Sequence, residues 1–266
     1  MNWKALVMIM VMFVMVESEV ECSKKVEIVA HRGASYIAPE NTLAAYNLAW
    51  EMKSDAVEID VYLTADKQIV VSHDSDTFRT TGTRMNIPKS ALEDLRQLDA
   101  GKWKGSDYTG EKLPTLEEVL KTIPKGKRIL MEIKCGPEII PVFLVELKRL
   151  RKSDRQVAVI SFNIEVIKAI KLARPRMQAY WLTVPTAENA DTVITTAKSV
   201  KADGLDLAAT DALNFEYVRK IRDARLKLHV WTVDDTAVGK RLAELGVDGI
   251  TTNKPDVMLK ALRDLK

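Results

Sequence analysis

The sequence predicts an α/β protein built as a TIM-type (β/α)8 barrel. Past Val26, apolar runs alternate with amphipathic stretches, which is the pattern of βα units that form a parallel sheet. Eight such units can be counted, and eight units close a barrel of this type. The chain has 266 residues, 47% hydrophobic and 29% charged, which is enough for one large globular domain, expected over residues 23–266.

Each expected strand is a short apolar run, and amphipathic stretches follow as helices. The strands centre on Val29, Ile59, Met131, Val159, Trp181, Leu205, Val230 and Ile250, and helices are expected to begin near Asn41, Glu138, Asn163, Ala187, Ala212, Thr236 and Pro255. A ninth β-like run, 68–72, follows the second strand too closely for a crossover helix, so we expect it to form a hairpin with that strand.

Residues 75–127, after this hairpin, lack the rhythm of the barrel and are predicted to be mostly an insertion. Near the end of this stretch, Thr115 is followed three residues later by Glu118. This spacing is a capping box and predicts that a helix begins there.

The first 22 residues are expected to be a secretory signal peptide. Lys4 precedes an apolar run over 5–16 that is too short to span a bilayer. A buried N-terminal helix is the alternative, but the run has no amphipathic period, which favours export to the periplasm or the medium. Lipidation of Cys22, giving a membrane-anchored lipoprotein, is a second alternative, although residues 19–21 match such a signal poorly.

The charge and cysteine content of the sequence bear on nucleic-acid binding and on disulfides. The formal net charge of +3 and the lack of a basic run interleaved with aromatics do not indicate nucleic-acid binding. With two cysteines, the fold has no disulfide framework, and Cys135 is expected to pack as a small apolar residue.

Carboxylates occur at alternate positions of two expected strands. Glu58 and Asp60 share one strand face, and burying both on an apolar strand requires a compensating cation, most simply a metal ion. Glu132 and Lys134 share a face of another strand, where an internal ion pair is the alternative interpretation. Residues that end different strands of a barrel converge on one site.

His31 ends the first expected strand and is followed by Arg32. A single histidine is usually structural, but beside an arginine and a Glu-x-Asp pair we favour a catalytic role. The planar guanidinium of Arg32 suits bidentate contact with a phosphate, and a surface salt bridge is the alternative.

Several motifs in order resemble the signature of glycerophosphodiester phosphodiesterases. They are His31-Arg32-Gly33-Ala34, Pro39-Glu40-Asn41-Thr42, Glu58-x-Asp60-Val61, Thr64-x-Asp66 and Val70-Val71-x-His73-Asp74. The resemblance implies catalysis by His31 and His73, metal binding by Glu58, Asp60 and Glu132, and substrate or phosphate binding by Arg32, Lys134 and Trp231. Three carboxylates without a Cys or a His-x-x-x-His pair indicate one hard divalent cation, Mg²⁺ or Ca²⁺.

Other residues of these motifs admit structural explanations. Trp231, which in the family lines the glycerol pocket, would also be ordinary as a core aromatic, and His229 is expected to be a packed interior residue. Either Asn41 or Thr42 can cap the first helix, with a supporting role near the site left open. The closing segment 249–255 is expected to complete the barrel with little direct chemistry.

The sequence therefore predicts an exported, metal-dependent phosphodiesterase that hydrolyses glycerophosphodiesters to sn-glycerol 3-phosphate and an alcohol. One alternative is phospholipase-D-like action on lysophospholipids. Another is a barrel without activity that binds phosphodiesters or a protein partner, but every polar position that the resemblance requires is filled.

Overall fold

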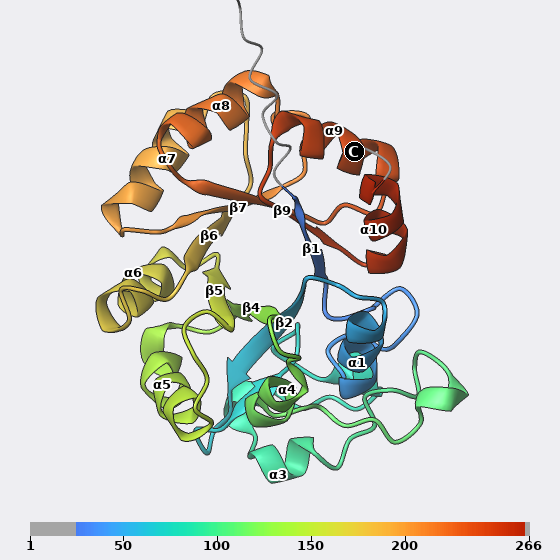
Figure 1. The fold of residues 1–266 in the computed structure, drawn as a ribbon. Coiled ribbons are helices and arrows are strands. Elements are labelled where there is room, and N and C mark those ends of the chain that lie inside the picture. The colour runs from blue at the N-terminus through green and yellow to red at the C-terminus, as the bar shows by residue number, and fades with distance from the viewer. Residues whose placement is uncertain (1–24, 264–266) are drawn as a thin grey trace, which may run out of the picture.

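The computed structural model describes residues 25–263, which form a closed barrel of parallel strands surrounded by helices (Figure 1). The predicted leader and Cys22 lie outside the described residues. The barrel strands are β1 (Glu27–Ala30), β2 (Ala56–Leu63), β4 (Arg128–Ile133), β5 (Val157–Ser161), β6 (Ala179–Thr183), β7 (Gly204–Ala208), β8 (Lys227–Trp231) and β9 (Gly249–Thr252). Pairing of β1 with both β2 and β9 closes the barrel, as predicted.

The expected hairpin is also present. Strand β3 (Ile69–Val71) pairs antiparallel with the end of β2, with Val61 opposite Val71. The side chain of Thr64 fixes the turn, because its hydroxyl donates to Asp66 and accepts from the amide of Gln68. Strand β3 runs back along β2, so that the amide of Ser72 donates to the backbone oxygen of Asp60 directly before His73.

Helices surround the barrel and follow the strands. They are α1 (Leu43–Glu51), α4 (Leu116–Thr122), α5 (Ile140–Arg149), α6 (Ile164–Ala173), α7 (Ala190–Ser199), α8 (Phe215–Asp223), α9 (Thr236–Leu245) and α10 (Pro255–Arg263). Helices α7 and α8 begin three residues later than predicted. For α8 the reason is Asn214, whose side chain accepts from the amide of Tyr217 and caps the helix there.

The alternation of side chains along the strands builds two packing layers. In β2, Ile59 and Val61 pack outward in the main core between strands and helices, whereas Glu58 and Asp60 point into the barrel. Cys135 packs against the main core, as expected. His229 is also a packed interior residue, as predicted, and its ring stacks on Tyr180 with 4.8 Å between ring centroids.

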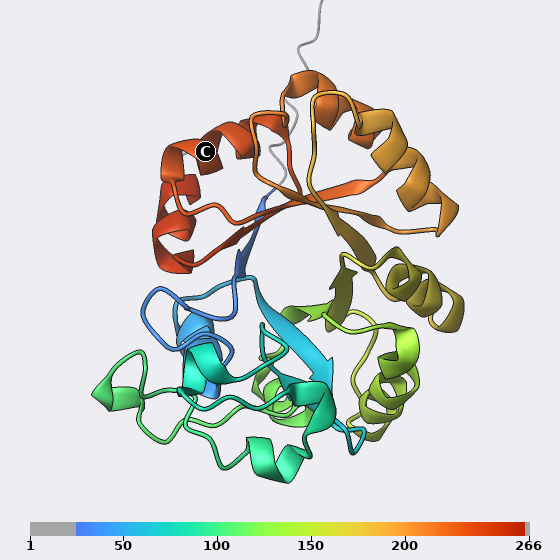
Figure 2. The same ribbon diagram turned by 180° about the vertical axis from the view of Figure 1, so that it is seen from behind.

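The stretch between β3 and β4 is an irregular segment followed by a barrel helix. It contains the short helices α2 (Phe78–Thr81), η1 (Ile87–Lys89), α3 (Leu92–Leu95) and η2 (Ser106–Tyr108). A small separate core ties it to Val70 of β3, beside β2 (Figure 2). Helix α4 has the predicted capping box, in which Thr115 and Glu118 bond reciprocally, and it packs on α1. Among the described residues, no helix has the length and apolar character needed to cross a membrane.

Candidate active site

The C-terminal ends of the barrel strands surround a pocket that gathers seven of the eight predicted site residues. They are His31, Arg32, Glu58, His73, Glu132, Lys134 and Trp231, and the remaining wall comprises Ile160, Phe162, Leu182, Asp206, Thr232 and Thr251. The eighth residue, Asp60, is buried next to Arg32 and Lys134. The structure therefore brings all eight residues into one region, although they come from three strands and three loops.

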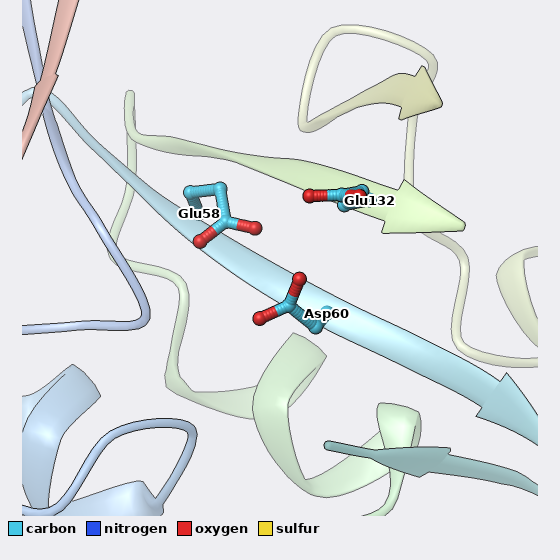
Figure 3. Close-up of side chains that lie close together, drawn as sticks. All are labelled: Glu58, Asp60 and Glu132. Atoms are coloured by element: carbon cyan, nitrogen blue, oxygen red, sulfur yellow. The ribbon is translucent and has the colours of Figure 1, made fainter. Parts of the chain in front are cut away.

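Three carboxylates form the acidic centre of this region. Glu58 and Asp60 of β2 lie beside Glu132 of β4, with one oxygen of each within 4.8 Å of the others (Figure 3). The parallel register, which places Asp60 opposite Glu132, sets this arrangement. Glu58 is 2% exposed and Asp60 is 1% exposed, and one oxygen of each has no hydrogen-bond partner among the described residues. Such unpartnered buried oxygens are the donor atoms that a hard cation binds.

Burial and mutual repulsion disfavour the charged forms of these carboxyl groups. Burial, followed by the charges of Asp60 and Glu132, raises the pKa of Glu58 well above its usual value. Burial and the charge of Asp60 raise the pKa of Glu132 to about 7. The carboxylates of this centre thus lack sufficient positive charge around them, which is the condition that a bound cation would relieve.

Two cations already lie against the acidic centre. The Nε of Arg32 lies 3.2 Å from Asp60, and the Nζ of Lys134 lies 2.8 Å from Glu132 and 3.4 Å from Asp60. Three carboxylates carry one more negative charge than these two side chains neutralise. A divalent cation would reverse the balance to one net positive charge, which a phosphodiester monoanion would neutralise. The donor set therefore fits a divalent metal ion.

The loop after β1 adapts its backbone to this centre. Arg32 has a positive φ of 55°, and its backbone N–H donates to Glu58 Oε2 at 2.9 Å. Asn41 also has a positive φ, 58°, and its Nδ2 donates to Asp60 Oδ2 at 2.8 Å. Thr42, rather than Asn41, caps α1. The Pro-Glu-Asn-Thr turn consequently supports an acidic residue of the site, the possibility that the sequence left open.

Hydrogen bonds define the tautomer of His31. Asn253 Nδ2 donates to Asp234 at 2.7 Å, which fixes the amide so that its Oδ1 accepts from His31 Nδ1 at 2.7 Å. The lone pair of the imidazole is therefore on Nε2. Burial, followed by the charge of Arg32, lowers the pKa of His31 to about 4, so the ring is neutral at pH 7. The closing segment was expected to contribute little chemistry, but its Asn253 orients a predicted catalytic histidine.

His73 belongs to a chain of alternating charges that the sequence analysis missed. Its Nδ1 lies 2.7 Å from Asp74 Oδ1, Asp74 accepts from Arg79, Arg79 donates to both oxygens of Glu40, and Glu40 accepts from Arg32. Burial alone would raise the pKa of Glu40, but the bonds from Arg79 and the charge of Arg32 lower it to about 2. The network connects His73 with Arg32 through Arg79, an arginine of the insertion. Arg79 is far from Arg32 and Glu40 in the sequence, so the sequence motifs did not indicate this connection.

The barrel and its site indicate a hydrolase class, because histidines that can transfer protons, cationic side chains and clustered carboxylates at the strand ends are suited to phosphodiester cleavage. Residues 31–257 match the model of the glycerophosphoryl diester phosphodiesterase family. The chain belongs to this family, and it is a glycerophosphodiester phosphodiesterase, a phosphoric diester hydrolase.

Individual relatives resemble the chain over most of its length. The Bacillus subtilis protein YhdW is 35% identical, over 88% of this chain and 96% of its own. The glycerophosphodiester phosphodiesterase of Bacillus subtilis is 34% identical, over 87% of this chain and 85% of its own. An Oleispira antarctica phosphodiesterase, solved in complex with the product sn-glycerol-3-phosphate, superposes with a TM-score of 0.82 at 31% identity, covering 89% of this chain and 96% of that one.

Arg79 offers a test of the charge network. Replacing it with alanine removes the partner shared by Asp74 and Glu40, so His73 and Arg32 lose their support and we expect kcat for glycerophosphocholine to fall about tenfold. Arg84→Ala is the matched control, because Arg84 pairs with Asp76 and is highly exposed. Steady-state kinetics measure both variants, and an Arg79→Ala enzyme as fast as the control would contradict the role of the network.

Proposed function

We propose that this enzyme hydrolyses glycerophosphodiesters to sn-glycerol 3-phosphate and an alcohol with one divalent cation, Mg²⁺ or Ca²⁺, held by Glu58, Asp60 and Glu132. The observation that carries the proposal is the cluster of these three carboxylates, two of which line the same pocket as the two histidines. The product bound to the Oleispira antarctica relative supports the same product here. Turnover of glycerophosphocholine, -ethanolamine, -glycerol and -inositol, with sn-glycerol 3-phosphate as the readout, tests the reaction and its range.

The cation would polarise the phosphoryl oxygens and offset the charge that develops on them. Arg32 and Lys134 lie against the same carboxylates, so their remaining N–H groups are placed to bind the phosphate. Trp231 lines the pocket beside them and forms an edge-to-face pair with Phe162, with 5.6 Å between ring centroids. These residues bind and orient the diester.

The two histidines divide the proton transfers. The neutral ring of His31, with its lone pair on Nε2, takes the proton from the attacking oxygen, which belongs to water or to the glycerol 2-hydroxyl. Asp74 accepts a hydrogen bond from Nδ1 of His73, and His73 in its imidazolium form gives the proton on Nε2 to the leaving alcohol oxygen, which leaves a neutral ring protonated on Nδ1. A P–O bond to the attacking oxygen forms while the P–O bond to the alcohol breaks. If a cyclic phosphate forms first, water opens it in a second step.

The metal proposal predicts loss of activity after chelation and recovery with Mg²⁺ or Ca²⁺. Glu58→Gln removes a charged ligand, so we expect apparent metal affinity to fall at least about tenfold. Added ion should raise the thermal midpoint of chelated wild type because it binds the folded state, and this shift should vanish in Glu58→Gln. Glu165→Gln, on an exposed carboxylate of α6, is the control and should keep the shift. Full activity of wild type in excess chelator would refute the proposal.

The histidine roles predict opposite responses to the leaving group. On an alkyl diester, His31→Ala and His73→Ala should each lose about 100-fold or more in kcat. A p-nitrophenyl diester leaves without a proton, so it should restore His73→Ala and leave His31→Ala impaired. His229→Gln, which alters the packed histidine, should leave the ratio between the two substrates unchanged. Rescue of His31→Ala instead would exchange the two roles.

We also propose that the protein is exported, on the basis of the charged and apolar leader. Mass spectrometry of protein from the native host should find a mature chain that begins downstream of about residue 18. A diacylglyceryl mass on Cys22 would identify an anchored lipoprotein. An intact Met1 in the cytosolic fraction would rule out export.

A further inference from the structure

The pocket wall contains a buried carboxyl group outside the acidic centre, with no assigned role. Asp206 of β7 lines the pocket, is 1% exposed, and its Oδ1 has no hydrogen-bond partner among the described residues. It does not belong to the carboxylate cluster that could hold a metal ion. A buried carboxyl oxygen without a partner is costly to the fold, so its retention in a binding pocket points to a ligand that completes its hydrogen bonding.

A second buried polar atom without a hydrogen-bond partner also lines the pocket. Thr251 of β9 lines the pocket, is 2% exposed, and its Oγ1 also lacks a hydrogen-bond partner among the described residues. Strand β8 lies between these two strands and contributes Trp231, whose Nε1 donates to the backbone oxygen of Asp206 at 3.1 Å. Two polar groups therefore flank an indole ring on three consecutive strands.

Much of the remaining pocket wall is apolar. Ile160, Phe162 and Leu182 line it together with Trp231. A small polyol fits such a wall, because its carbon chain can lie against the rings and aliphatic groups while its hydroxyls reach isolated polar atoms. Phosphate placed against Arg32 and Lys134 would leave the glycerol carbons to extend toward this wall.

We propose that Asp206 and Thr251 bind the free hydroxyl groups of the glycerol moiety and so select glycerol over diols that lack the terminal hydroxyl. This inference rests on the proposed function. Burial and the charge of Glu132 raise the pKa of Asp206 well above its usual value, which favours a neutral carboxyl that can donate and accept without repelling the phosphate. A site built to hydrogen-bond a hydroxyl discriminates strongly against an analogue without it.

The test compares glycerophosphocholine with its 2-hydroxypropyl analogue, in which the terminal CH2OH is a methyl group. We expect wild type to prefer the glycerol substrate by about tenfold or more in kcat/KM. Asp206→Leu should lose most of this preference through a higher KM for glycerophosphocholine, with little change on the analogue. Asp206→Asn, which keeps hydrogen-bonding capacity, should retain much of the preference.

Two further variants separate this role from a structural one. Thr251→Val, nearly equal in volume, should reduce the preference independently, and it carries the test if Asp206→Leu fails to fold. Tyr180→Phe is the control, because that buried hydroxyl does not line the pocket, so the preference should be unchanged. Asp206→Leu should also raise the thermal midpoint, whereas a structural aspartate would lower it.

Two outcomes would overturn the inference while leaving the proposed function intact. If Asp206→Leu and Thr251→Val each lowered kcat/KM equally on both substrates, these residues would not select for the terminal hydroxyl. Loss on glycerophosphocholine with normal turnover of glycerophosphoglycerol would mean that Asp206 binds the cationic alcohol and not the glycerol. Failure of wild type to hydrolyse any glycerophosphodiester would instead reject the proposed function itself.

Discussion

The repulsion among three clustered carboxylates on adjacent strands, two of them buried, is the constraint to which the rest of the site responds. The register of β2 and β4 forces Asp60 and Glu132 together, and burial removes the water that would screen them. Arg32, Lys134 and Asn41 each direct a donor at this centre, two of them from a backbone with positive φ. Strain in the loop after β1 is thus explained by the charge that the loop must compensate.

A chain of alternating positive and negative side chains extends outward from the acidic centre and connects the irregular insertion to the barrel. Glu40 is shared by Arg32 and Arg79, and Arg79 also holds Asp74, the partner of His73. The insertion has its own small apolar core and contacts the site through this arginine. Electrostatic contacts at the pocket, rather than a continuous hydrophobic core, therefore align the insertion with His73.

The strands around the barrel opening differ in character. Strands β2 and β4 concentrate carboxylates that could hold a metal ion, whereas β5 to β9 contribute aromatic and aliphatic side chains with isolated polar atoms. A glycerophosphodiester has a matching distribution of groups, because it has a charged phosphate and a small polyol at one end. Unsatisfied polar atoms on both sides reduce the stability of the free protein, which is the usual condition of a binding site built for a ligand.

The sequence by itself determined the barrel and the hairpin and indicated eight candidate site residues that the structure brings into one region. It could do so because strand periodicity and short motifs are local and the C-terminal ends of parallel strands must converge. It also identified His229 as a packed residue. Only the tertiary structure decided the contacts of Arg79 with Glu40, of Asn253 with His31, and the position of Asp206 in the pocket wall. These residues are distant along the chain and sit in unremarkable local sequence, so their roles depend on strand register and barrel closure, which no single segment encodes.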